Sequence, residues 1–166
     1  SKSVRETADK SLTVTQKTQL DFWHSFKEYV ETTGSRIRCQ KPGPQTWMLV
    51  AIGRSGVTLE GIFSSSNTEG KSGVGEIRVE LLMSDDRAKT YFAELETMKA
   101  EIEKDFGGPM IWSNPEELKQ AKVYVRKDAQ VNDRDDWPNQ HAWLKENLEK
   151  FDRIFRDRVK ALSPDN

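Results

Sequence analysis

Few residues of this chain have the types and spacing that chemistry requires. The histidines His24 and His141 are far apart, and neither has a second histidine or a cysteine at ligand spacing. Cys39 is the single cysteine, so it cannot form an intramolecular disulfide, and no zinc or nucleophile motif surrounds it. Metal and acid–base sites need several converging groups. We therefore expect no catalytic residue and no cofactor.

The acidic residues toward the C-terminus have two interpretations. Asp128, Asp133, Asp135 and Asp136 offer carboxylate oxygens to a hard cation, but they lack the glycine and the terminal glutamate of a calcium loop. Asp135 and Asp136 also precede a predicted helix, where negative charge is favourable and an Asp can cap free N–H groups. We favour capping.

Basic residues are the candidates for nucleic-acid contact. The set is Arg36, Arg38, Lys41, Arg54, Arg78 and Arg126. The first three lie in a connection stiffened by Pro-Gly-Pro, and the fourth in a glycine-bounded turn, so loops could gather four cations at one edge. Trp47 and Trp112 could stack on bases, although strand tryptophans are more often core. Because 26 Lys and Arg balance 27 Asp and Glu, such a site must be a local patch.

Two periodicities indicate the elements that position these residues. Side chains alternate from Ile77 to Met83, as in a half-buried strand, and a helix over 85–106 follows, capped by Ser84 and ended by Gly107. The other predicted elements are a helix from Thr15 to Gly34, strands over 46–52, 57–63, 110–112 and 122–127, and a last helix from Trp137. The polar segment 64–75 predicts a mobile loop without convergent charge.

The order α-β-β-β-α-β-β-α predicts an α+β fold. Short connections favour a mostly antiparallel five-stranded sheet with three helices, chiefly on one face. Residues 15–162 would form a single α+β domain, residues 1–14 a linker or disordered arm, and residues 163–166 a tail. The absence of a membrane span or a signal peptide favours a cytoplasmic protein.

The other face of this sheet should be polar. Strand pairing would place Thr58, Glu60, Arg78, Glu80, Lys122, Tyr124 and Arg126 near one another. Opposite charges across strands are commonly solvated ladders, which is the simpler interpretation. The alternative is that Arg78 and Arg126 contribute to binding.

A nuclease is the alternative class of function. Helix, three strands, helix and strand is the element order of restriction-endonuclease-like cores, which need an Asp in the second strand and Glu-x-Lys in the third to hold a metal ion. The candidate metal ligands are Glu60 and Glu80. Glu80 precedes Leu81-Leu82, so the motif is incomplete, and the fold alone does not imply the activity.

Six motifs resemble an uncharacterised domain family of bacteria and archaea over residues 15–162. They are Gln19-Leu-Asp-Phe-Trp, Lys41-Pro, Gln45-x-Trp47, Ile52-Gly-Arg-Ser-Gly56, Arg78-Val-Glu-Leu81, and Trp143-Leu with Phe151 and Phe155. Family members often form the C-terminal domain of chains with a restriction-endonuclease-like N-terminal domain. The resemblance implies a non-catalytic accessory domain of a nuclease-like or defence-related protein, contributing nucleic-acid contact or self-association. The expected partners are DNA or RNA, the N-terminal nuclease-like domain and a second copy.

Overall fold

The computed structural model describes residues 11–163 of the chain. Its elements are α2 (Val14–Thr33), β1 (Trp47–Arg54), β2 (Val57–Ser64), β3 (Gly75–Met83), α3 (Ala88–Glu96), α4 (Lys99–Phe106), β4 (Ile111–Ser113), β5 (Ala121–Ala129), the 3-10 turn η1 (Arg134–Asp136) and α5 (Trp137–Lys160). Most of the predicted arm and tail lies outside the described residues. The described part is a mixed helix and strand structure, as predicted.

The strands form one antiparallel five-stranded sheet in the order β1-β2-β3-β5-β4. The hairpin between β1 and β2 turns at Ser55 and Gly56. Gly56 has φ of +81°, and a Cβ there would lie 2.0 Å from Asp85 Oδ2, so a side chain does not fit. The turn therefore depends on a glycine for both conformation and space.

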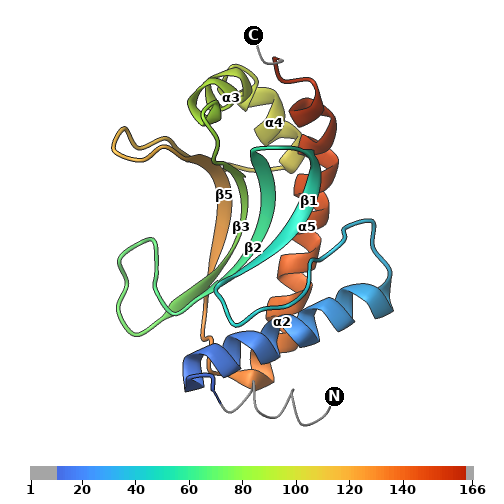
Figure 1. Cartoon of the computed structure of the whole chain (residues 1–166), viewed down its shortest axis with the longest axis vertical. Helices are drawn as coiled ribbons and strands as arrows, with labels where there is room; N and C mark the ends of the chain where they lie inside the picture. Colours follow the sequence, from blue (N-terminus) through green and yellow to red (C-terminus); the bar gives the residue numbers. More distant parts are fainter. Residues whose placement is uncertain (1–10, 164–166) are drawn as a thin grey trace.

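The helices pack on one face of this sheet, where α5 contacts β1, β2 and β3 (Figure 1). The side chains of Ile77, Val79 and Leu81 on that face are fully buried, as the alternation of β3 predicts. Gly61 leaves room for Trp23 of α2 and Leu148 of α5. On the side of the sheet away from α5, the loops 65–74 and 114–120 project to the left in Figure 1.

The described residues contain four α-helices, so the prediction of three is wrong. The predicted helix over 85–106 breaks into α3 and α4 at Thr97 and Met98. The Thr97 hydroxyl donates to Glu94 O at 2.5 Å, and Met98 N bonds to Leu95 O, three residues back, instead of Glu94 O. Such local bonds compete with the regular helical ladder.

Two helix starts also differ from prediction. Ser84 does not cap α3, which begins at Ala88; instead, Ser84 N donates to Gly56 O across the sheet end. The N-cap of α2 is Thr13, not Thr15, and Thr13 forms a reciprocal capping box with Gln16. In both places the apolar periodicity identified the helix but not its first residue.

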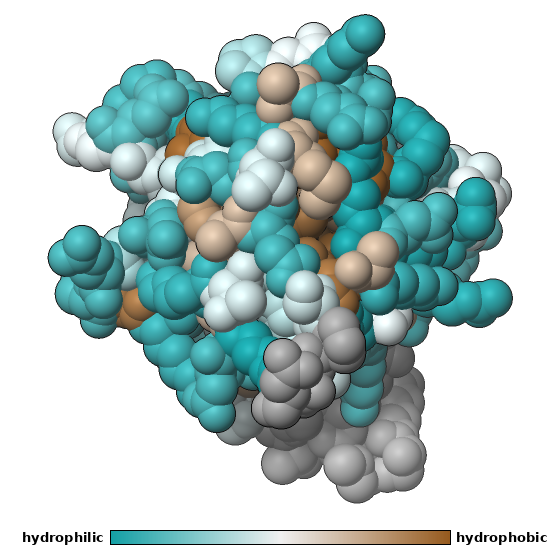
Figure 2. Space-filling model, turned by 90° about the horizontal axis from the view of Figure 1, so that it is seen from above, coloured by the Kyte–Doolittle hydropathy of each residue, from teal (hydrophilic) through white to brown (hydrophobic). Residues whose placement is uncertain are grey.

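The outer surface is largely hydrophilic when viewed from the end that carries α3 and α4, with only small hydrophobic patches (Figure 2). Within the described residues, no helix combines the length and apolar character needed to cross a membrane.

Candidate functional site

The six basic residues predicted to bind nucleic acid lie in three separate places. Arg36, Arg38 and Lys41 are exposed in the connection between α2 and β1. Arg54 ends β1, whereas Arg78 and Arg126 lie on the polar face of the sheet, on β3 and β5. The six therefore do not form one surface.

Arg54 is held by the C-terminal end of α5. Its Nη1 donates to Val159 O at 3.2 Å and to Leu162 O at 2.7 Å. Its Nη2 donates to the Tyr91 hydroxyl at 3.2 Å and to Ser163 O at 3.1 Å. Because the last carbonyls of a helix lack partners within the helix, this guanidinium caps α5. The Arg54 guanidinium is therefore engaged within the fold and does not contribute to the predicted basic edge.

Arg78 and Arg126 are members of an ion-pair chain on the polar face. The chain alternates in sign through Lys122, Glu80, Arg78, Glu76, Arg126, Asp128 and Lys71. Arg78 Nε lies 2.8 Å from Glu80 Oε1, and Arg126 Nε lies 2.8 Å from Glu76 Oε1. Both arginines are thus neutralised within the chain. The predicted ladder of opposite charges is present, but it is not solvated, because Glu76 is fully buried and the side chains of Arg78 and Arg126 are 13% and 10% exposed.

The segment 65–74 joins this ion-pair chain, so the prediction that it lacks convergent charge is wrong. Glu69 pairs with Arg126, and Lys71 pairs with Asp128. Thr68 donates its N–H and its hydroxyl to Glu76 Oε1, each at 2.9 Å. Glu76 is fully buried, and burial alone would raise its pKa, yet the hydrogen bonds from Arg126, Thr68 and Arg78 lower it. The loop is therefore fastened to the sheet.

Glu60 and Glu80, the alternative metal ligands, pair directly across β2 and β3. Burial, together with the charge of Glu80, raises the pKa of Glu60 to about 6. Glu80 already accepts hydrogen bonds from Arg78 and from Lys122. No group of three or more His, Cys, Asp or Glu within residues 11–163 is arranged to hold a metal ion. The nuclease alternative thus rests on two carboxylates, one of which is engaged in ion pairs.

Of the four acidic residues considered as cation ligands, Asp128 and Asp136 have structural partners. Asp128 lies in β5, where hydrogen bonds from Lys71, Arg126 and Asn67 hold its pKa well below the usual range. Asp136 is the N-cap residue of α5, but its carboxylate accepts from the Asn139 and Gln140 side chains and not from the helix backbone. The prediction that an Asp side chain caps the backbone of α5 is therefore wrong.

The histidines and the cysteine do not converge. His24 is exposed on α2, while His141 is buried among aromatic rings, and burial lowers its pKa to about 4. Burial raises the pKa of the Cys39 thiol to about 11, so the reactive thiolate is scarce at neutral pH. Trp112 packs edge-on against Phe92 in the core.

An arginine-lined hollow of about 270 Å³ lies where the α2–β1 connection meets β1 and α5. Its lining residues are Arg36, Arg38, Ala51, Asp152 and Arg156. Arg156 is fixed in place: its Nε and Nη2 donate to Asp152 Oδ1 at 2.9 and 2.5 Å, and Nη2 also donates to Ala51 O at 3.2 Å. The hollow therefore has one rigid guanidinium and two exposed ones.

The exposed guanidiniums of the arginine-lined hollow are unneutralised. The side chains of Arg36 and Arg38 form no hydrogen bond or ion pair with the described residues, and the buried Ile37 anchors the connection between them. Three arginines against Asp152 give the lining a net charge of +2. Lys160 is close by, since its Cε lies 3.1 Å from the position of a Cβ on Gly53.

Sequence reasoning identified Arg36 and Arg38 but missed Arg156. A signal was available, because Asp152, Arg156 and Lys160 recur every four residues and so share one face of a helix. Nothing local, however, indicates that this face meets the connection before β1. The hollow is a product of tertiary packing.

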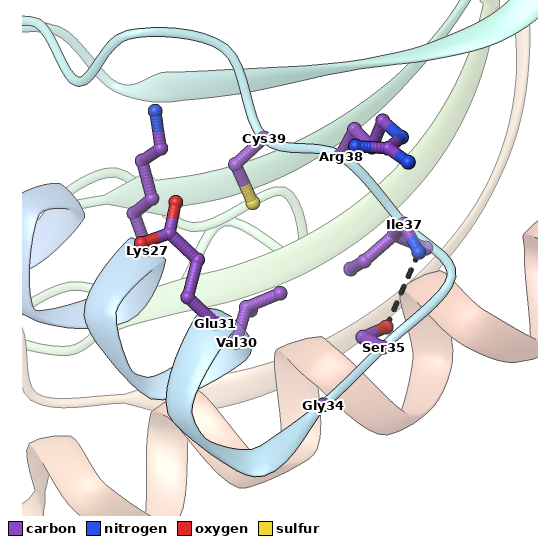
Figure 3. Close-up of a pocket in the computed structure, with 8 residues that line it drawn as sticks. All are labelled: Lys27, Val30, Glu31, Gly34, Ser35, Ile37, Arg38 and Cys39. Atoms are coloured by element: carbon purple, nitrogen blue, oxygen red, sulfur yellow. Dashed lines mark hydrogen bonds between the residues drawn. The ribbon is translucent and has the colours of Figure 1, made fainter.

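A second hollow, of about 530 Å³, lies on the α2 side of the same connection (Figure 3). Lys27, Val30 and Glu31 of α2 face it, and Arg38 and Cys39 belong to its opposite wall. Lys27 and Glu31 carry opposite charges, so this lining is weakly charged compared with the arginine-lined hollow. Arg38 borders both.

Searches among curated proteins and among solved structures gave no match. A protein-family model does match, over residues 18–159, which include every described strand and most of α2 and α5. The chain therefore belongs to the family described as a domain of unknown function, DUF4268.

Proposed function

We propose that this domain is a non-catalytic accessory module that contacts nucleic acid through the arginine-lined hollow. The observation that carries the proposal is the pair Arg36 and Arg38, which are exposed and have no ion-pair partner among the described residues, beside the oriented guanidinium of Arg156. Arginine presents a planar fork of donors that suits phosphate oxygens, and it keeps its charge at all physiological pH values. Phosphate contacts supply most of the affinity in sequence-independent binding.

The polar face of the sheet is a poorer place for a polyanion. Its basic residues are Lys71, Arg78, Lys122 and Arg126, and its acidic residues are Glu60, Glu69, Glu76, Glu80 and Asp128. Acids outnumber bases there by one, and the basic side chains are already paired. Like charges at an interface repel the ligand, so the arginine-lined hollow is the favoured surface.

The family resemblance supports a wider context for this proposal. In it, the domain follows a restriction-endonuclease-like domain in a bacterial or archaeal defence protein and helps to hold the nucleic acid that the other domain cuts. Self-association is the second candidate. It is favoured by Trp47 and Ile111, which are 42% and 40% exposed on β1 and β4, the two edge strands.

Fluorescence anisotropy at several salt concentrations tests the nucleic-acid proposal. Each phosphate contact steepens the dependence of log K on log salt by about 0.9 for duplex DNA or about 0.7 for single strands. Arg36→Ala/Arg38→Ala should therefore weaken binding and flatten the slope by roughly 1.4–1.8. Arg153→Ala is the matched control, because Arg153 is exposed on α5 but does not line the hollow.

An unchanged slope in Arg36→Ala/Arg38→Ala, or no binding by the native chain at low salt, would overturn the proposal. Self-association is measured separately by sedimentation velocity, comparing the native chain with Trp47→Ala and Ile111→Ser. A concentration-dependent dimer that either change dissociates would support the second candidate.

A further inference from the structure

We propose that the arginine-lined hollow accepts the terminal phosphate monoester of a nucleic-acid strand, in preference to internal phosphodiesters. This inference rests on the proposed function and specifies which part of the nucleic acid the site recognises. Charge, shape and preorganisation support it independently.

The charge of the hollow matches a monoester. Arg36, Arg38 and Arg156 against Asp152 give +2. A phosphate monoester carries about −1.5 to −2 at pH 7 and three acceptor oxygens. An internal phosphate has one charge, and a strand that follows several of them needs an extended basic track. Here the unpaired cations are gathered around one point.

The shape of the hollow suits a small end group. Its volume of about 270 Å³ is below the roughly 300–1,000 Å³ of pockets that enclose drug-sized ligands. Among the described residues, no aromatic side chain lines it, and Ala51 is the one uncharged residue that does. Because stacking on aromatic rings is how proteins commonly hold unpaired bases, this lining addresses phosphate and not base.

The site also contains a prepared anchor. Asp152 is 6% exposed, and its Oδ1 and the Ala51 carbonyl together fix Arg156. These bonds use Nε and Nη2, and Nη1 makes no hydrogen bond with the described residues. Arg156 Nη1 lies 3.7 Å from the position of a Cβ on Gly53, and Lys160 Cε lies 3.1 Å from the same position, so a further cationic side chain passes close to this nitrogen. Arg36 and Arg38 then close over the phosphate from the connection.

The test uses three labelled single strands of one sequence, about ten nucleotides long, that carry a 5′-phosphate, a 3′-phosphate or hydroxyls at both ends. The label is internal, so that both ends stay free. Because hydrogen bonds to charged groups are stronger than neutral ones, a phosphorylated end should bind the native chain at least about tenfold more tightly than the hydroxyl strand. Arg36→Ala/Arg38→Ala should remove this preference, and Arg153→Ala should keep it.

The outcomes separate this inference from the proposed function. Equal affinity for all three strands, with weaker binding of each by Arg36→Ala/Arg38→Ala, would overturn the end preference and keep nucleic-acid contact. If the native chain binds none of the three strands and does not bind a duplex either, both the end preference and the proposed nucleic-acid contact are overturned. A preference for a phosphorylated end that persists in Arg36→Ala/Arg38→Ala would move the end site elsewhere and overturn this inference. Circular dichroism of each variant verifies that the fold is intact.

Discussion

At the scale of single residues, the long polar side chains were placed least well by sequence. Arg54 and Arg156 illustrate the reason. The sequence put Arg54 in a basic turn, yet its guanidinium caps α5, more than a hundred residues later. Arg156 gave no local sign that it reaches Ala51 O on β1. The position of each guanidinium is set by a contact between segments that are distant in the sequence, and local periodicity does not encode such contacts.

His141 permits a prediction about pH. Its ring lies 4.6 Å from that of Phe22 and 5.6 Å from that of Phe26, and burial lowers its pKa from 6.5 to about 4. Between these values the unfolded chain binds more protons at this site than the folded chain. The free energy of unfolding should therefore fall as the pH drops from 6.5 to 4, by about 3 kcal/mol.

Urea unfolding at pH 7 and at pH 4 measures this effect, with His141→Gln as the comparison. Gln lacks the titrating ring, so its loss of stability between the two pH values should be smaller than that of the native chain by about 3 kcal/mol. His24→Gln, at an exposed position, should behave as the native chain does. Equal pH dependence in His141→Gln and the native chain would contradict the assignment.

At the scale of elements, the strands and their buried faces were predictable, because an alternating pattern fixes which side chains meet the core. β2 and β3 have nearly the predicted bounds. The division between α3 and α4 was not predictable, since no Gly or Pro marks Thr97 and Met98. The apolar spacing continues through the break, so both helices bury side chains: Leu95 on α3 and Ile102 on α4 are fully buried.

The packing of these helices gives a prediction for the core. Leu95 on α3 and Leu148 on α5 are fully buried within the same hydrophobic core. Replacing either with Ala removes buried methyl groups and leaves a cavity, which should cost about 2–5 kcal/mol. Thermal or urea unfolding measures the loss. Glu96→Ala is the control, because Glu96 is exposed beside Leu95 and should change stability by less than about 0.5 kcal/mol. A midpoint unchanged in Leu95→Ala would contradict the packing of α3.

At the scale of the whole molecule, positive and negative charges are nearly equal in number, but they are unevenly distributed over the surface. On the polar face, most acidic and basic side chains pair with one another in the ion-pair chain, which also holds the 65–74 loop against the sheet. In the arginine-lined hollow, Arg36 and Arg38 of the α2–β1 connection lie beside Arg156 and have no ion-pair partner within residues 11–163. Composition predicted a local patch but not its members, because the hollow joins segments that are separated by more than a hundred residues.

This joining gives the last prediction, which links binding to folding. The three segments of the hollow meet only in the folded chain, so a single strand with a phosphorylated end should stabilise the native state by mass action. At a free concentration of one hundred times Kd, the gain is about 2.7 kcal/mol. For a domain of this size it should raise Tm by roughly 5–10 °C. Arg36→Ala/Arg38→Ala should unfold at the native Tm without the strand, because both side chains are exposed, and should gain little from it. An equal rise in that variant would show that the stabilising contact lies outside the hollow.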